Sequence, residues 1–501
     1  MISRGLPAAG GRVVAVLVMV LMLGAASAPA ASHARPRAAR AAALRIAGSP
    51  ALFPPFNRSV TDYVARCTAG KRLHLSISAP SGVTVAIDRG KARKGSFGKA
   101  VRVKSGQSFR FVVATRHGHR RYFVRCLPPD FPAWTTERPG HPQAAWYVVA
   151  PCCSASTYVA IFDTNGVPLW WINTHRPPLD ASLLPDGNVV WAQQKGADLA
   201  PGISSGTYEE HRLDGTPVRT FSLPDGTPTD RHEMQLLANG DYLVDAYKAR
   251  NGVDLSPYGG PPDATVLDAL VEEVTPHHKV AWSWNSADHI DLSETGRWYQ
   301  QHVIDSPVKL PDGRMAYDIV HFNAVEPYGR QRVLVSLRHT DAVYAVDKPS
   351  GSILWKLGGT QTSRSLSILG DDVADFGGQH DVRVLPDGTI TMFDNGTGRG
   401  RGPRALRFRV DPNAMTATLL DRISDAAVTD SPCCGSARRL PGGNWVMSWG
   451  GTDLVEETTA TGERAFALQF PSLISYRAFP VLSGQLTRGA LRTGMDSMRP
   501  R

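Results

Sequence analysis

The stretch Leu385-Pro386-Asp387-Gly388-Thr389-Ile390-Thr391-Met392 decides the fold class, because the chain repeats its pattern. A tight turn containing glycine stands between two apolar, strand-forming runs, as in a β-hairpin. Similar turns occur at 184–191, 237–244 and 440–447. A second hairpin motif alternates with the first, and in it a turn glycine leads into an aromatic strand, as at 162–171 and 344–355. Two hairpins per unit predict four-stranded units at irregular spacing, which is typical of a β-propeller.

These repeats predict an all-β chain with a six-bladed β-propeller over residues 140–485. The blade count depends on the turn at 310–313, which could belong to a blade or to an insertion. Residues 44–130 alternate like short strands, for example at 73–78 and 109–115, and predict a small N-terminal β-sandwich. The proline-rich stretch 128–132 is the predicted linker between the two.

Residues 1–34 have the features of a signal peptide and leader. Arg4 and Arg12 supply positive charge, residues 13–23 form an apolar run, and the small residues at 26–30 suit signal peptidase. The apolar run is short for a bilayer span, so an uncleaved anchor is the less favoured alternative. We expect a protein that is secreted or associated with the cell envelope, with no membrane span after signal removal. The oligomeric state stays open.

Six cysteines in an exported chain favour disulfides. Cys67 and Cys126 lie near the two ends of the predicted sandwich, and we predict that they are bridged. The adjacent pairs Cys152-Cys153 and Cys433-Cys434 lie near the two ends of the predicted propeller. Bridges between these pairs would close its ring. Vicinal bridges are a weaker alternative, and a zinc site is weaker still because the CxxC spacing is missing.

The formal net charge of +10 admits a nucleic-acid partner. However, the charge is interpreted as scattered, and no basic helix or aromatic-interleaved stripe occurs, so no nucleic-acid partner is expected. A basic exported protein that handles small anions fits the charge at least as well. The arginine-rich loop 399–404 is either a solvated turn or an attractor of an anionic substrate.

Three histidines share one register relative to the hairpin turns. His232, His321 and His380 lie eight residues before Gly240, Gly329 and Gly388, respectively. This offset places each histidine at the start of an innermost strand, and the innermost strands of a propeller line its central channel. The returning strand should bring Arg338 and His339 back beside His321. We therefore expect several imidazoles and one guanidinium at one mouth of the channel, although polar packing around a channel water is the alternative.

Two chemistries fit such a cluster. Neutral imidazole is a common metal ligand, but Arg338 would repel a cation, so no metal is expected. Binding and transfer of a tetrahedral anion is favoured, because guanidinium makes forked bonds to sulfate or phosphate oxygens. One neutral histidine can then attack the central atom while the others donate to oxygens or exchange a proton with the leaving group.

Four segments together resemble the arylsulfotransferase family: 379–396, 318–323, 335–339 and 355–359. The resemblance covers most of residues 140–480. It implies an exported six-bladed propeller that moves a sulfuryl group from an aryl sulfate ester to a phenolic acceptor, without a nucleotide donor or other cofactor. It also implies a ping-pong route through a sulfo-histidine. The implied catalytic residues are His380 as nucleophile with His321, Arg338 and His232, and the implied substrate-binding residues are His339, Asn323 and Asn395.

Three other functions remain open at this point. A non-catalytic binding propeller for an extracellular glycan or protein would keep its function without His380. A hydrolase would pass the sulfuryl or phosphoryl group to water. A metal-dependent propeller enzyme such as a lactonase would need channel carboxylates. Glu233 and Asp381 follow their histidines directly and are expected to point away from the histidine face of the strand.

Overall fold

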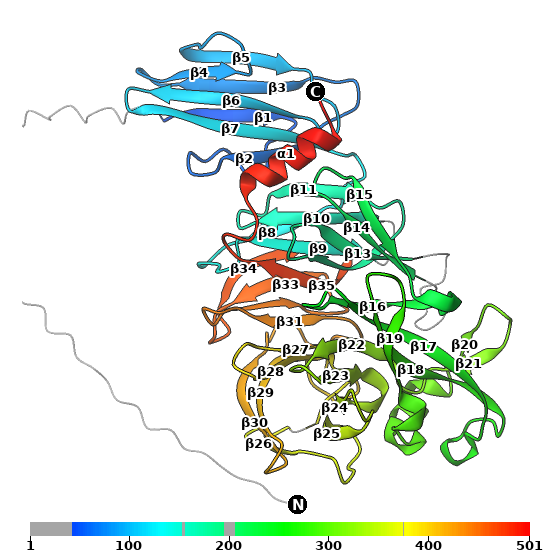
Figure 1. Cartoon of the computed structure of the whole chain (residues 1–501). Coiled ribbons are helices and arrows are strands. Elements are labelled where there is room, and N and C mark those ends of the chain that lie inside the picture. Colours follow the sequence, from blue (N-terminus) through cyan, green and yellow to red (C-terminus); the bar gives the residue numbers. More distant parts are fainter. Residues whose placement is uncertain (1–42, 153–155, 195–205, 374) are drawn as a thin grey trace, which may run out of the picture. The chain divides into compact units, whose positions relative to one another are not determined.

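The computed structural model describes residues 43–152, 156–194, 206–373 and 375–501. The predicted signal peptide and leader at 1–34 and Cys153 lie outside the described residues. Almost all regular structure in the described part of the chain is strand (Figure 1), so the predicted all-β class is confirmed. None of the helices in the described part has the length and apolar character that a membrane crossing requires.

Residues 45–127 form two facing sheets around their own apolar core. Their alternating burial, as in Leu73–Ala79 with every second residue buried, is the period-2 pattern of a half-buried strand. One sheet contains β1 (Arg45–Ser49), β3 (Leu73–Ala79) and β5 (Gly95–Val101). The other contains β2 (Asp62–Arg66), β7 (Gly118–Leu127), β6 (Ser108–Thr115) and β4 (Thr84–Ile87). The predicted disulfide Cys67–Cys126 is present, with its Cα atoms 5.4 Å apart.

The chain from Thr135 to Val481 forms the propeller, and its described residues make six sheets, each with an antiparallel four-stranded core. The first contains β9 (Trp146–Cys152), β10 (Tyr158–Asp163) and β11 (Pro168–Asn173), with β35 (Ile474–Val481) along β9. The second contains β12 (Pro178–Leu183), β13 (Val189–Gln194), β14 (Gly206–His211) and β15 (Pro217–Phe221). The third contains β16 (Thr229–Leu236), β17 (Tyr242–Val253), β18 (Ala264–Val274) and β19 (Val280–Asn285).

The remaining three sheets repeat this order. The fourth contains β22 (Phe322–Pro327), β23 (Arg332–Leu337), β24 (Ala342–Asp347) and β25 (Ile353–Gly358). The fifth contains β27 (His380–Val384), β28 (Ile390–Asp394), β29 (Arg404–Asp411) and β30 (Thr416–Ile423), with β26 (Ser367–Leu369) added at its edge. The sixth contains β31 (Ser436–Arg439), β32 (Trp445–Ser448), β33 (Leu454–Thr458) and β34 (Arg464–Gln469), with β8 (Thr135–Glu137) at its edge.

The innermost strands of the six sheets form a closed ring. Each contacts the next in the order β12, β16, β22, β27, β31 and β35, and β35 contacts β12 in turn. Because β35 pairs with β9, the last strand of the propeller completes its first sheet. Equivalent positions on these strands therefore converge near one axis.

The turn at 310–313 belongs to an insertion. It joins the short strands β20 (Val308–Lys309) and β21 (Met315–Tyr317), which are added to the third sheet. The same insertion holds three 3₁₀ or π turns: η3 (Ser286–Asp288), η4 (Leu292–Thr295) and η5 (Tyr299–Val303). Another turn, η2 (Ser256–Tyr258), lies in the connection between β17 and β18. Two further turns are η1 (Pro224–Gly226) and η6 (Arg338–Thr340).

Sequence patterns did not predict the C-terminal helix α1 (Arg488–Met498). Thr487 caps it by accepting a hydrogen bond from the backbone of Ala490, and Leu491 and Met495 are buried in the core of the first propeller sheet. Toward the sandwich, Arg492 and Arg488 both pair with Asp62, and Asp496 accepts from Arg125 at 2.7 Å.

The adjacent cysteines Cys433 and Cys434 lie in the loop before β31, with their sulfur atoms 2.8 Å apart. Cys152 ends β9. Because Cys153 lies outside the described residues, the bridges between the two adjacent pairs stay a prediction.

Candidate functional site

The structure brings the predicted histidines and arginine together at the inner ring. His232 lies on β16, His321 directly precedes β22, and His380 is the first residue of β27. The ring centroids of His232 and His321 are 5.4 Å apart, and those of His321 and His339 are 4.7 Å apart. The backbone N–H groups of Arg338 and His339 donate to the carbonyls of His321 and Val320 at 2.8 and 2.9 Å. The returning strand therefore ends beside His321.

The innermost strands carry β-bulges at this level. The pairing register shifts between Thr229 and Met234 in β16 and between His380 and Arg383 in β27, and again at the start of β22. His321 and Asp381 adopt φ values of 48° and 55°. A bulge re-aims a side chain and breaks strict alternation, so simple alternation does not decide which way these residues point.

His380 is buried, and its Nδ1 lies between two acceptors. The carbonyl oxygen of Gly378 is 2.9 Å away and the amide oxygen of Asn395 is 2.7 Å away. The Asn395 amide has a fixed orientation, because its nitrogen donates to the carbonyls of Cys434 and Ser431. Nδ1 must therefore carry the proton, which leaves the Nε2 lone pair open for attack.

The electrostatic surroundings keep His380 neutral. Burial lowers the pKa of His380 well below its usual value, and the charges of Arg338 and His321 lower it further. The hydrogen bond that His380 donates to Asn395 opposes this shift without reversing it. At neutral pH the ring is thus an uncharged imidazole, which is the nucleophilic form.

His321 and His232 have a different partner behind Nδ1. The carboxylate of Asp318 lies 2.7 Å from Nδ1 of His321 and also accepts from its backbone N–H. Asp230 contacts Nδ1 of His232 in the same way. A carboxylate at Nδ1 fixes the ring orientation and stabilises a proton taken up at Nε2. Asp230 and Asp318 were not singled out by sequence reasoning, although each lies within three residues of its histidine.

Arg338 is a buried cation that lacks a carboxylate partner among the described residues. Guanidinium has five N–H donors. One of them bonds His339 Nε2 and one bonds the Pro432 carbonyl, both at 2.8 Å, while Nε has no acceptor. The guanidinium also stacks on the ring of Trp298, 4.3 Å from its centroid. A buried charge without a counter-ion is unfavourable, so this arrangement is prepared for an anionic ligand.

His339 holds Arg338 in place. Its Nδ1 is 2.6 Å from the carbonyl of Asp318 and its Nε2 accepts from Arg338, so both ring nitrogens are used within the protein. Asn323 is also engaged, because its amide nitrogen donates to the Gln379 carbonyl at 2.7 Å. Its amide oxygen is buried and has no hydrogen-bond partner. The structure thus places His339, Asn323 and Asn395 behind the reacting groups.

An insertion contributes residues that sequence reasoning missed. Trp298 covers Arg338, and His302 lies 5.4 Å from His339, ring to ring. Asp341 links this insertion to the segment that leads into His380, because it accepts from Trp298 Nε1 at 2.9 Å and from the Gly378 backbone at 2.8 Å. No repeated motif marks these residues, since the insertion breaks the hairpin pattern.

The arginine-rich loop 399–404 is neither a solvated turn nor a reservoir of unpaired charge. Arg401 and Arg404 both pair with Asp394, and Arg404 also pairs with Asp371. Arg399 pairs with Asp341. The loop therefore supports the end of β28, next to Asn395.

Two groups offer ligand-type atoms close enough for a metal ion: Asp318 with His321 and His339, and Asp230 with His232 and Asp245. In the first group, Arg338 donates to His339 Nε2, so a cation would have to lie beside the guanidinium. In the second group, burial and the charge of Asp230 raise the pKa of Asp245 well above its usual value. A shared proton between the two carboxyls explains that arrangement without a metal.

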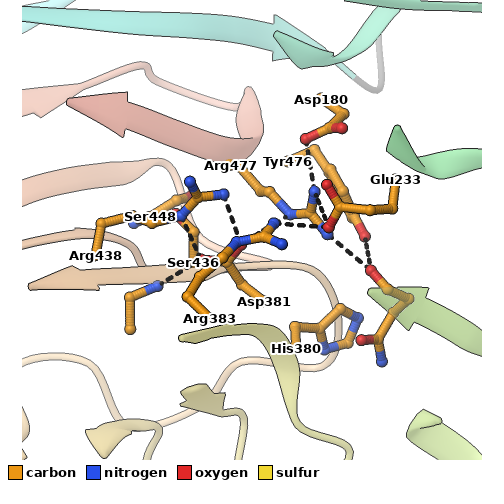
Figure 2. A network of polar contacts seen from close by, with 12 residues as sticks. Asp180, Glu233, His380, Asp381, Arg383, Ser436, Arg438, Ser448, Tyr476 and Arg477 are labelled. Carbon is orange, nitrogen blue, oxygen red and sulfur yellow. Dashed lines mark hydrogen bonds and ion pairs between the residues drawn. The ribbon is translucent and has the colours of Figure 1, made fainter. Parts of the chain in front are cut away.

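A network of buried charges lies beside His380 (Figure 2). Arg383 pairs with Asp381 and Glu233 at 2.7 and 2.6 Å, and Arg477 pairs with Asp180 and Glu233 at 2.7 and 3.0 Å. Glu326 and Arg438 extend the network to the remaining innermost strands. Glu233 and Asp381 thus serve as counter-ions, away from the imidazoles.

Comparison with known proteins assigns the family. The model of the arylsulfotransferase (ASST) family matches residues 182–471, which include every histidine and arginine of the site. The chain belongs to the arylsulfotransferase family. No curated protein matches the sequence of this family member.

Two solved structures that resemble this chain share little sequence with it. A protein of unknown function from Bacteroides caccae is 11% identical, with a TM-score of 0.41 over 68% of this chain and 99% of that one. A virginiamycin B lyase from Staphylococcus aureus is 9% identical, with a TM-score of 0.33 over 66% of this chain and 88% of that one. Likenesses of this size carry no argument about function.

Proposed function

We propose that this arylsulfotransferase transfers a sulfuryl group from an aryl sulfate ester to a phenolic acceptor, through a sulfo-histidine on His380 and without a nucleotide donor. The observation that carries this proposal is the pairing of a neutral, oriented imidazole with a buried, uncompensated guanidinium. The first supplies a nucleophile, and the second supplies binding for a tetrahedral anion.

In the first half-reaction, Nε2 of His380 attacks the sulfur of the donor. The S–O bond to the aryl group breaks, and the electron pair leaves on the aryl oxygen. That oxygen takes a proton from Nε2 of His232, whose Nδ1 is held by the carboxylate of Asp230. Burial and the charge of Arg338 keep the pKa of His321 well below its usual value, so the neutral His321 ring, with its Nδ1 at Asp318, can only accept at Nε2. Arg338 binds the sulfuryl oxygens through its remaining N–H groups, and His380 keeps its Nδ1 proton between Asn395 and Gly378.

In the second half-reaction, the oxygen of an acceptor phenol attacks the sulfur and the N–S bond breaks. The phenol proton passes to the histidine that served as donor, which restores the starting state. A phenol has a pKa of about 10, so proton exchange at its oxygen assists both halves.

The test is mass spectrometry of the purified protein after brief exposure to 4-nitrophenyl sulfate, with phenol added to a parallel sample. We expect a sulfuryl adduct on His380 that disappears with phenol, and no adduct or turnover in His380→Ala. His211→Ala is the matched control, since His211 bonds the Gly215 carbonyl within the second sheet's last hairpin. An adduct lost equally fast without phenol would indicate the hydrolase. No adduct and no nitrophenol across several aryl sulfates would favour the binding propeller.

A further inference from the structure

The excess of positive charge lies in the part of the chain that precedes the propeller in sequence. Residues 44–130 contain 17 lysines and arginines but only three aspartates and glutamates. Residues 131–501 contain 33 lysines and arginines and 42 aspartates and glutamates. The expectation of scattered charge was therefore wrong. The sandwich is strongly basic, while the catalytic region carries a net negative charge.

The cations of the sandwich face solvent. All but Arg125 of the 17 are exposed. The three acidic residues are engaged with other parts of the chain: Asp62 with Arg488 and Arg492, Asp88 with Arg501, and Asp130 with the hydroxyl of Tyr158. The domain thus supplies almost no negative charge to offset its own surface.

A cluster of these cations lies at one end of the β3–β5 pair. Leu73 pairs with Val101 at the end of the two strands, so Arg72 and Arg102, each one residue beyond its strand, lie next to each other at that end of the strand pair. Lys71 and Arg72 line a pocket of about 540 Å³ together with His74, Thr68 and Ser49. Within the described residues, neither Lys71, Arg72 nor Arg102 forms an ion pair. Like charges on facing strands destabilise a sheet, and a bound polyanion would relieve that repulsion.

We propose that the sandwich binds a linear phosphodiester polymer of the cell envelope, of the polyol phosphate type, with the Lys71, Arg72 and Arg102 cluster as its main contact. Twelve of the 17 cations are arginines, whose forked donors suit phosphate oxygens. The cations extend over several strands and loops, which suits a flexible chain with regularly spaced charges.

Two other polyanionic partners fit the surface less well. The large apolar side chains that are exposed in the described residues all lie in the propeller, so the sandwich offers none for insertion into a lipid surface. The described sandwich also contains no helix that could enter the groove of a duplex. The polymer proposal does not depend on the sulfuryl-transfer chemistry. It depends on the predicted export only because the protein must leave the cytoplasm to reach a polymer of the cell envelope.

The experiment measures binding of the full chain to immobilised poly(glycerol phosphate) at two salt concentrations. We expect affinity to fall about 50-fold between about 50 and about 200 mM salt, as for about four phosphate contacts. The triple variant Lys71→Gln, Arg72→Gln, Arg102→Gln should bind at least about 10-fold more weakly at low salt and show a shallower salt dependence. Turnover of aryl sulfate should be unchanged, because these residues lie outside the propeller.

A matched control removes three exposed charges from the propeller: Arg212→Gln, Lys279→Gln and Arg330→Gln. The control should bind as the unmodified chain does. Equal weakening of both triple variants, with thermal melting unchanged, would reduce the effect to net charge and overturn the proposal. Absence of binding would also overturn it, as would equal or tighter binding to duplex DNA or to phosphatidylglycerol vesicles.

Discussion

At the scale of single residues, the site distinguishes its histidines by what lies behind Nδ1. His380 has the neutral oxygens of Asn395 and Gly378, whereas His321 and His232 have carboxylates. A neutral partner fixes the tautomer without favouring the imidazolium. Three similar side chains can therefore divide the work of attack and proton exchange between them.

Asn395→Asp should raise the pKa of His380, because a negative charge at Nδ1 favours the imidazolium. The neutral form is the nucleophile, so the acid limb of kcat/KM should move to higher pH. In the unmodified protein, burial keeps the pKa of His380 low, and activity should persist below pH about 6.5. A pH–rate profile measures both, and an acid limb that stays in place in Asn395→Asp would contradict the assignment of Nδ1.

Arg338→Lys should lower kcat/KM by about 100-fold or more while the melting temperature changes little. A lysine cannot keep the bonds to His339 and Pro432 and still present several donors to a sulfuryl group. Steady-state kinetics with 4-nitrophenyl sulfate, alongside thermal melting, provides the check. Normal kinetics in this variant would remove Arg338 from the site.

At the scale of elements, the hairpin repeat and the shared histidine offset were visible in the sequence because both are local patterns. They located the innermost strands and hence His232, His321 and His380. The β-bulges were not visible, since a bulge depends on the pairing of two distant strands. Trp298 and Asp341 were not predicted as site residues for the same reason, because their contacts with Arg338 and Gly378 exist only after folding.

The helix α1 was not predicted from the sequence for a different reason. It has 11 residues, of which Leu491, Gly494 and Met495 are buried, so its apolar stripe is too short to register as a pattern. Its stability derives from packing against the first sheet and from the ion pairs with Asp62, which the sequence alone does not reveal.

Gly378→Ala should reduce activity by disturbing the turn that positions His380. Gly378 has a φ of +67°, and a Cβ there would lie 3.2 Å from both Arg338 Cγ and Trp298 Cζ2. The added methyl group would displace the guanidinium. We therefore expect a clear loss of kcat with little change in the melting temperature. Gly388→Ala is the control, because it also has positive φ but open space around the Cβ position. Equal kinetic losses in both variants would show that strain alone, rather than contact with Arg338, is responsible.

At the scale of the whole molecule, the axial charge network joins all six sheets. Asp180, Glu233, Glu326, Asp381, Arg438 and Arg477 lie on six different innermost strands. Each buried charge depends on partners from neighbouring sheets. The network therefore joins the six innermost strands to one another.

Arg383→Met should destabilise the protein by about 3–5 kcal/mol, because it leaves the buried carboxylates of Asp381 and Glu233 with fewer counter-ions. Arg314→Met should leave the free energy of unfolding nearly unchanged, since its pair with Asp312 is exposed and screened by solvent. Urea unfolding of both variants gives the comparison. Similar free energies of unfolding would contradict a supporting role for the network.

The pairing of β35 with β9 also determines when the ring of sheets can close during synthesis of the chain. The strand that completes the first sheet follows every other strand of the propeller along the chain, so the ring stays open until residues 474–481 have been synthesised. A nascent or truncated chain keeps unpaired edges that chaperones and proteases recognise. A chain that stops before Ile474 therefore cannot acquire the closed form.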